Sequence, residues 1–305
     1  ALWWRFASFE IAMSVADEFS RFRAAYNVSA DQAGTISLRY RRITRQLNWD
    51  FRSLDSEIQN SLYVGSYGRD TAASGVSDID VAFILPPELY GRYHAHVGNG
   101  QSALLQAVRN SIQKTYPLTA IAGDGQVVKT TFSDGMQFEV LPVFNNTSGT
   151  WTFADSNGGG SWQSCNPRAE IAAINAMNTA TNKNLKYLCR MMRKWKAYWE
   201  VPIPGMLIDT LAYGFINSWS HRDKSFIYHD YMARDFFAYL MGQSDQAYWR
   251  APGSTSYVYP AGNFRPKART AYNLALEAID HDQAKRDWSR RQKWREVFGP
   301  SYPST

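Results

Sequence analysis

The fold is decided by a loop and the strand that follows it: Val64-Gly65-Ser66-Tyr67-Gly68-Arg69-Asp70-Thr71 and Ser77-Asp78-Ile79-Asp80-Val81-Ala82-Phe83-Ile84-Leu85. Residues i and i+2 of a strand lie on the same face. Asp78 and Asp80 therefore project together, and the alternate residues Ile79 and Val81 pack on the opposite face. The pattern predicts two carboxylates at one edge of a buried strand.

A pair of carboxylates at this spacing is suited to Mg²⁺, which favours one or two protein carboxylates completed by substrate phosphates. Gly65 has no Cβ, so its backbone can approach a ligand closely. The backbone N–H groups of Gly65 and Ser66, with the Ser66 hydroxyl, are suited to triphosphate oxygens. An Asp-x-Asp pair is also common in surface turns, and that interpretation stays open for the pair taken alone.

A predicted hairpin supplies a third carboxylate. Residues 126–132 and 136–144 are rich in strand-forming side chains and flank a Ser-Asp-Gly turn. Glu139 alternates with Phe138 and Val140 and faces away from them. If its strand lies beside the Asp-x-Asp strand, Glu139 joins Asp78 and Asp80; the alternative is an ordinary exposed strand glutamate.

These motifs resemble the DNA polymerase β-type nucleotidyltransferases and, within them, the bacterial cGAS/DncV-like nucleotidyltransferases (CD-NTases), the cyclic-oligonucleotide synthases of anti-phage signalling. The resemblance extends over roughly residues 60–215. It rests on Gly65-Ser66, Thr71, Ser77-Asp78-Ile79-Asp80, Glu139, Ser161-Trp162, Asn166-Pro167, Thr181-Asn182-Lys183-Asn184-Leu185-Lys186 and Ile208-Asp209-Thr210-Leu211.

The resemblance implies an α+β fold with two lobes, in which a small mixed sheet carries the carboxylates and a helical lobe closes over the nucleotide. It implies a long N-terminal helix that braces both lobes. We expect residues 1–60 to form the brace, 61–160 the catalytic core, 161–298 the helical lobe and 299–305 a flexible tail. An amphipathic helix is expected over residues 36–58, and a long mobile loop over residues 145–165.

The resemblance also implies an activity: condensation of ATP, GTP or both into a cyclic di- or trinucleotide second messenger, with release of pyrophosphate. Asp78, Asp80 and Glu139 would be catalytic and would hold two Mg²⁺ ions, with Mn²⁺ as an alternative. Gly65, Ser66, Ser161 and Lys186 would bind the nucleotide. Many members of the broader superfamily have Asp where this chain has Glu139, and a solvent-facing basic stripe is the alternative for Lys186.

Composition limits the partners only broadly. The 305 residues hold 33 Lys and Arg against 27 Asp and Glu, a formal net charge of +6 that favours polyanionic ligands without selecting among them. Two cysteines, Cys165 and Cys189, cannot build a disulfide framework, and no apolar run has transmembrane length, so we expect a cytoplasmic protein. We expect no membrane and no obligatory nucleic acid as partner, and accessory or effector proteins of a defence operon as partners.

Three other functions are compatible with parts of the pattern. One is a template-independent enzyme that makes linear oligonucleotides or extends RNA ends, and another is a catalytically silent nucleotide-binding scaffold. The third is a kanamycin-type antibiotic nucleotidyltransferase, which shares the Gly-Ser and Asp-x-Asp pattern. The likeness in residues 161–211 favours the cyclic-oligonucleotide synthase, and the intact carboxylates argue against the scaffold.

Overall fold

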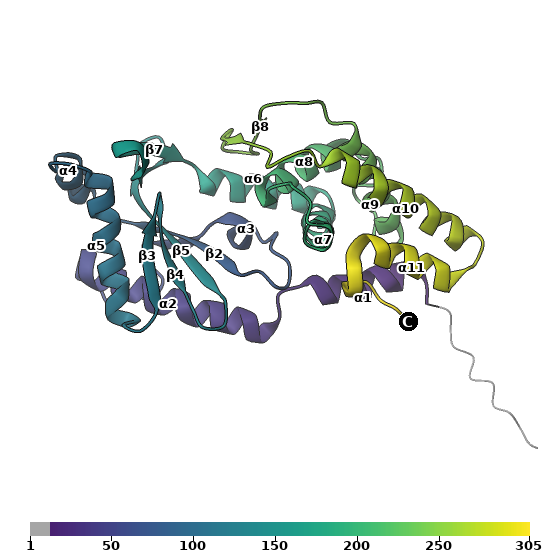
Figure 1. The fold of residues 1–305 in the computed structure, drawn as a ribbon, viewed down its shortest axis with the longest axis horizontal. Coiled ribbons are helices and arrows are strands. Elements are labelled where there is room, and N and C mark those ends of the chain that lie inside the picture. The colour runs from purple at the N-terminus through teal and green to yellow at the C-terminus, as the bar shows by residue number, and fades with distance from the viewer. Residues whose placement is uncertain (1–12) are drawn as a thin grey trace, which may run out of the picture.

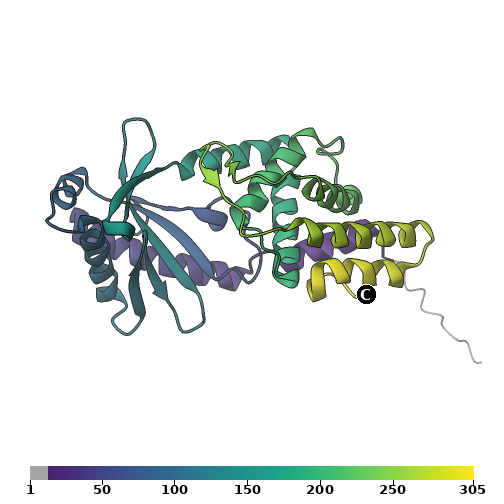
Figure 2. The same ribbon diagram turned by 45° about the horizontal axis from the view of Figure 1, so that its top comes forward.

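The computed structural model describes residues 13–305. Figures 1 and 2 show two lobes, a sheet with covering helices at one end and a bundle of helices at the other. The first two helices, α1 (Val15–Tyr26) and α2 (Ala30–Arg52), run along one side of both lobes. The first 12 residues of the predicted brace lie outside the described part of the chain.

The sheet is mixed, as expected. Its main path has the order β1-β2-β5-β4-β3, in which β2 and β5 are parallel and the other neighbours antiparallel. The strands on this path are β1 (Ser61–Tyr63), β2 (Asp78–Ile84), β3 (Ala120–Asp124), β4 (Val127–Thr131) and β5 (Gln137–Asn145). The parallel pair matters most, because it brings the Asp-x-Asp strand beside the strand of Glu139.

Helices α2 and α5 (Gly100–Thr115) pack against the sheet, and α4 (Pro87–His94) lies at its end. Ile79, Val81 and Phe83 of β2 are fully buried under them, as the alternating pattern predicted. The helix expected over residues 36–58 ends at Arg52, earlier than predicted. The chain enters the left-handed region at Ser53, and the side chain of Asn48 donates to the carbonyl groups of Ser56 and Gln59, so the segment folds back as a loop.

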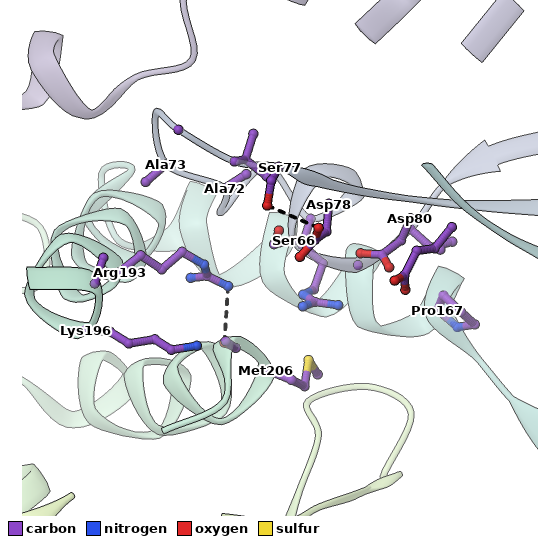
Figure 3. Close-up of a pocket in the computed structure, with 18 of the residues that line it drawn as sticks. Ser66, Ala72, Ala73, Ser77, Asp78, Asp80, Pro167, Arg193, Lys196 and Met206 are labelled. Atoms are coloured by element: carbon purple, nitrogen blue, oxygen red, sulfur yellow. Dashed lines mark hydrogen bonds between the residues drawn. The ribbon is translucent and has the colours of Figure 1, made fainter. Parts of the chain in front are cut away.

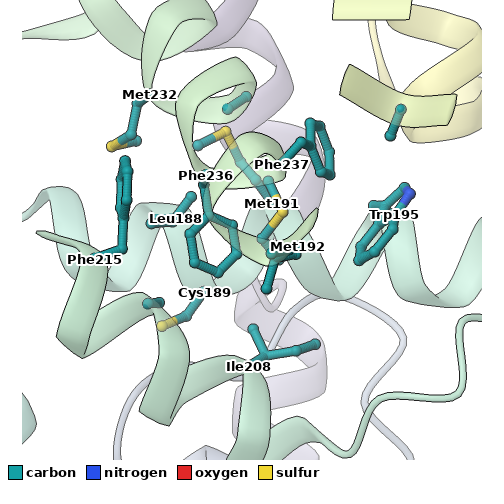
Figure 4. Close-up of a cluster of buried hydrophobic side chains, with 14 of the residues drawn as sticks. Leu188, Cys189, Met191, Met192, Trp195, Ile208, Phe215, Met232, Phe236 and Phe237 are labelled. Carbon is teal, nitrogen blue, oxygen red and sulfur yellow. The ribbon is translucent and has the colours of Figure 1, made fainter. Parts of the chain in front are cut away.

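The helical lobe is built around α7 (Asn184–Trp199). Its buried side chains Leu188, Met192 and Trp195 pack against Phe236 and Phe237 (Figure 4). Cys189 is buried in the same core. The lobe also contains α6 (Pro167–Ala180), α8 (Gly205–Ser218), α9 (His229–Met241), α10 (Arg265–Gln283), α11 (Asp287–Phe298), a short hairpin of β8 (Trp249–Arg250) and β9 (Tyr257–Val258), and the single-turn helix η2 (Phe226–Tyr228).

Two further sequence-based expectations are wrong. Residues 145–165 form a hairpin, β6 (Trp151–Asp155) and β7 (Ser161–Cys165), rather than a long loop, and β6 pairs with β5. Polar and glycine-rich composition hid the alternation of Trp151 and Phe153, whose rings are buried; the glycines lie in the turn, η1 (Asn157–Gly159).

The expected flexible tail is also ordered as far as Tyr302. After η3 (Gly299–Ser301), the ring of Tyr302 is fully buried and its hydroxyl donates to Glu18 of α1 at 3.0 Å. The ring of Tyr302 is part of the hydrophobic core of the helical lobe, so this core extends almost to the end of the chain. The domain limits themselves stay predictions, although the sheet continues to Cys165, past the expected boundary at 160.

Within residues 13–305, every helix is either too short or too polar to span a bilayer.

Candidate active site

The turn after β1 lies directly against the Asp-x-Asp strand. Its residues form the four-residue helix α3 (Gly65–Gly68), and the N–H of Val64 donates to the carbonyl of Asp80 at 2.9 Å. Gly65 has φ +58°, and a Cβ at this position would lie 1.8 Å from Oδ2 of Asp80. Glycine is therefore required here both for its backbone conformation and for the close approach to the carboxylate.

Three carboxylates line one cavity beside this turn. In the parallel register of β2 and β5, Asp80 lies opposite Glu139, and Asp78 is on the same face of β2. The cavity has a volume of about 810 Å³, and Gly65 and Ser66 also line it. Figure 3 shows Asp78 and Asp80 side by side, with side chains of the helical lobe across from them. The structure thus brings together the three acidic residues predicted from sequence and the Gly-Ser turn.

The electrostatics of Asp80 reflect this grouping. Burial raises the pKa of Asp80 to about 6, the neighbouring carboxylates of Glu139 and Asp78 add to the increase, and Arg69 opposes it. Like charges close together cost free energy unless a cation neutralises them. The raised pKa of Asp80 therefore reflects burial first and the nearby carboxylates second, and a bound cation would offset the repulsion among those carboxylates.

Among residues 13–305, no three carboxylate, imidazole or thiol groups are close enough to enclose a metal ion by themselves. Glu139 is paired with Lys129 of β4 at 3.3 Å, and the hydroxyl of Ser77 donates to Asp78 at 3.1 Å. The all-oxygen donor set still fits Mg²⁺, because this ion is usually held by few protein carboxylates and completed by water and substrate phosphates. Asp78, Asp80 and Glu139 are the residues that would hold it.

Basic side chains of α7 form the opposite wall of the cavity. Arg193, Lys194 and Lys196 line it, and Lys194 Nζ donates to the carbonyl of Ser74 at 2.8 Å. Arg193 and Lys194 belong to the basic stripe seen in the sequence, but Lys186 was its only candidate for phosphate contact, and Lys196 was not singled out. The signal was the spacing of Lys186, Arg190 and Lys194, which step by four along one helix face.

Lys186 and Ser161 do not line this cavity. Lys186 Nζ contacts Asp70 at 3.2 Å and donates to Asn175 at 2.7 Å, about two helical turns from Lys194. Ser161 begins β7, where its hydroxyl accepts a hydrogen bond from Gln163. A role of either residue in nucleotide binding stays a prediction.

A two-lobed α+β fold, with paired strand carboxylates beside a Gly-Ser turn and a basic helix across the cavity, is typical of the polymerase β-like nucleotidyltransferase fold. The model of the Second Messenger Oligonucleotide or Dinucleotide Synthetase (SMODS) domain matches residues 13–178. The chain belongs to this family, and the resemblance to CD-NTases inferred from sequence is confirmed.

Solved structures support the fold over nearly the whole chain. CdnC of Escherichia coli MS115-1, in a complex with a HORMA protein, is 18% identical with a TM-score of 0.64, covering 94% of this chain and 98% of that one. The CD-NTase CdnG of Bradyrhizobium diazoefficiens, in complex with GTP, is 12% identical with a TM-score of 0.66, covering 94% and 96%.

The cyclic AMP-GMP synthase DncV of Vibrio cholerae, with a linear intermediate, is 14% identical with a TM-score of 0.63, covering 95% and 87%. At these identities the likeness shows the fold alone, and it confirms the predicted α+β architecture. No match was found among curated proteins.

Proposed function

We propose that this protein condenses nucleoside triphosphates, ATP, GTP or both, into a cyclic di- or trinucleotide second messenger for anti-phage defence signalling. Membership of the SMODS family supports second-messenger synthesis. The observation that carries the proposal is the placement of Asp78, Asp80 and Glu139 on one face of adjacent strands, in a cavity bounded by basic side chains. We propose that the reaction takes place in the cytoplasm, where its nucleoside triphosphate substrates are found.

In the proposed reaction, a ribose hydroxyl of one nucleotide attacks the α-phosphorus of another triphosphate in line, and pyrophosphate leaves. In a second attack, the free ribose hydroxyl of the linear product attacks the α-phosphorus of its own 5′-triphosphate, which closes the ring and releases a second pyrophosphate. Divalent cations, Mg²⁺ or Mn²⁺, bound by Asp78, Asp80 and Glu139 would lower the pKa of the attacking hydroxyl and offset charge on the triphosphate.

The chain's own residues orient the substrate. The backbone of Gly65 and Ser66 is placed to bind the triphosphate against the carboxylates. Lys194 and Lys196, on the opposite wall, are placed to offset the charge that develops on the departing pyrophosphate. Because Lys194 and Lys196 line the cavity and Lys186 does not, these two lysines replace Lys186 as the first candidates for phosphate contact.

The test is incubation of the purified protein with all four nucleoside triphosphates and Mg²⁺. Mass spectrometry then identifies products that resist phosphatase, which removes the exposed terminal phosphates of linear products but cannot act on a closed ring. A cyclic product supports the proposal. A product that loses terminal phosphates to phosphatase, or extension of an added RNA primer, would favour the linear-oligonucleotide alternative. An aminoglycoside-dependent product would favour the antibiotic-modifying one.

We extend the proposal to an accessory protein. The structure of E. coli CdnC was solved in a complex with a HORMA protein. We infer that a protein encoded beside this chain controls its activity, and measuring product formation with and without each neighbouring gene product tests that inference.

A further inference from the structure

A buried carboxylate joins the catalytic turn to the helical lobe. Asp209 of α8 is fully buried, and its Oδ2 accepts hydrogen bonds from the Thr71 hydroxyl at 2.8 Å and from Nε of Arg69 at 3.0 Å. Arg193 of α7 donates to both of its oxygens, at 2.6 and 3.0 Å. One side chain therefore ties the segment after α3 to two helices.

Backbone hydrogen bonds connect Thr71 to the Gly65-Ser66 turn, which lines the carboxylate cavity. The N–H groups of Thr71 and Ala72 donate to the carbonyl of Ser66 at 2.9 and 3.1 Å. Ser66 follows Gly65, whose backbone lies against Asp80 with no room for a side chain. A change in the position of Thr71 would therefore move the Gly-Ser turn relative to Asp80.

The charges of the network balance. Arg69 also pairs with Glu170 at 3.3 Å, so two guanidinium groups face two carboxylates. Burial would raise the pKa of Asp209, but Arg193 and Arg69 outweigh it and hold that pKa below its usual value. The carboxylate is ionised at neutral pH, and its loss would leave two buried guanidinium groups facing one carboxylate.

We propose that Asp209 is a positioning residue for nucleotidyl transfer, which through Thr71 holds the Gly65-Ser66 turn against the carboxylates of Asp78 and Asp80. Asp209 does not line the cavity, so it would act through its neighbours and not by contact with the substrate. The inference rests on the proposed function, and it adds to that function a connection between helical-lobe packing and the geometry of the catalytic turn.

The chain contains a matched network away from the cavity. Glu18 of α1 is also fully buried, pairs with Arg290 of α11 at 2.6 Å, and accepts a hydrogen bond from the Tyr302 hydroxyl at 3.0 Å. None of these residues lines the cavity. Tyr302→Phe thus removes the same kind of hydrogen bond as Thr71→Val, from a buried hydroxyl to a buried carboxylate, without touching the turn.

The experiment compares two pairs of variants, Thr71→Val with Tyr302→Phe and Asp209→Asn with Glu18→Gln. For each we would measure the thermal midpoint, kcat and KM for nucleotide, and hydrogen exchange of residues 64–73. We expect Asp209→Asn to lower kcat by about 10²-fold and Thr71→Val by about tenfold, with much smaller changes in KM, because displacement of positioned groups affects mainly the transition state.

Hydrogen exchange of residues 64–73 should accelerate in these two variants alone, because local opening is governed by local contacts. Tyr302→Phe and Glu18→Gln should lower the thermal midpoint comparably and keep kcat and exchange at wild-type values. The double variant Thr71→Val with Asp209→Asn should have the same kcat as Asp209→Asn alone, because both substitutions break the same Thr71–Asp209 hydrogen bond.

Wild-type kcat and exchange in Thr71→Val would overturn the proposal, as would an equal loss of kcat in Tyr302→Phe. If Asp209→Asn does not fold, the comparison of Thr71→Val with Tyr302→Phe decides whether the contact with Asp209 positions the turn. If the wild-type protein makes no nucleotide product, the proposed function fails, and exchange of residues 64–73 alone decides whether Asp209 positions the turn.

Discussion

Substitution of Gly65 by alanine tests how closely the catalytic turn must approach Asp80. A Cβ at this position would lie 1.8 Å from Oδ2 of Asp80, and ordinary contact begins at 3.4 Å. The turn and the carboxylate must therefore separate by about 3.4 − 1.8 = 1.6 Å if no other atom moves. Displacement of a reacting group by about 1 Å costs on the order of 10²-fold in rate.

We expect Gly65→Ala to lower kcat/KM by at least about 10²-fold, which corresponds to about 3 kcal/mol of transition-state stabilisation. The positive φ of +58° adds a cost in folding stability, of about 1 kcal/mol for a residue with a side chain. The assay is the initial rate of nucleotide product formation, measured together with the thermal midpoint.

Gly135→Ala is the matched control. Gly135 has φ +83°, but nothing lies within 4 Å of its Cβ position, and it belongs to the turn between β4 and β5. This variant should lose similar stability and keep its activity. If Gly65→Ala retained the activity of Gly135→Ala, close approach of the turn to Asp80 would not be required for catalysis.

Further predictions concern the carboxylates. Asp78→Ala with Asp80→Ala should abolish product while the circular dichroism spectrum is unchanged, and Glu139→Gln should still bind nucleotide but turn over at least about 10²-fold more slowly, because cations stabilise mainly the transition state. With chelator present, the raised pKa of Asp80, about 6, means that the folded state holds the proton more tightly than the unfolded state. Stability should therefore fall as pH rises from about 4 to 6, by a free energy of about 3 kcal/mol. Asp80→Asn should unfold at a higher temperature than wild type at pH 8 but not at pH 4; equal midpoints at pH 8 would contradict this. Lys129→Met should tighten Mn²⁺ binding by no more than about fivefold, because the partly exposed Lys129–Glu139 pair is weak, whereas Lys114→Met, which removes a surface pair with Asp50, should leave it unchanged.

The acidic cluster could be predicted because strand periodicity determines which residues share a face. Ile79 and Val81 are buried and Asp78 and Asp80 face the cavity, as alternation requires. The position of Glu139 depended on one further assumption, that β5 lies beside β2, and the register confirms it.

Other features depend on contacts between distant parts of the chain. The network of Asp209 joins residues about 140 positions apart, and no local pattern encodes such a pairing. The hairpin of β6 and β7 was missed because glycine and polar residues outnumber Trp151 and Phe153, although those two rings anchor it. Lys186 was preferred because of the family resemblance. Lys186 and Lys194 lie on one helix face, and only the position of α7 along the cavity separates them.

The most direct test of the account is a crystal structure with Mn²⁺ and a non-hydrolysable nucleoside triphosphate, in which anomalous scattering locates the metal. We expect Mn²⁺ to be bound by the carboxylates of Asp78, Asp80 and Glu139, with Glu139 released from Lys129 and the triphosphate against Gly65 and Ser66. Manganese bound elsewhere, or a triphosphate held away from these carboxylates, would contradict it.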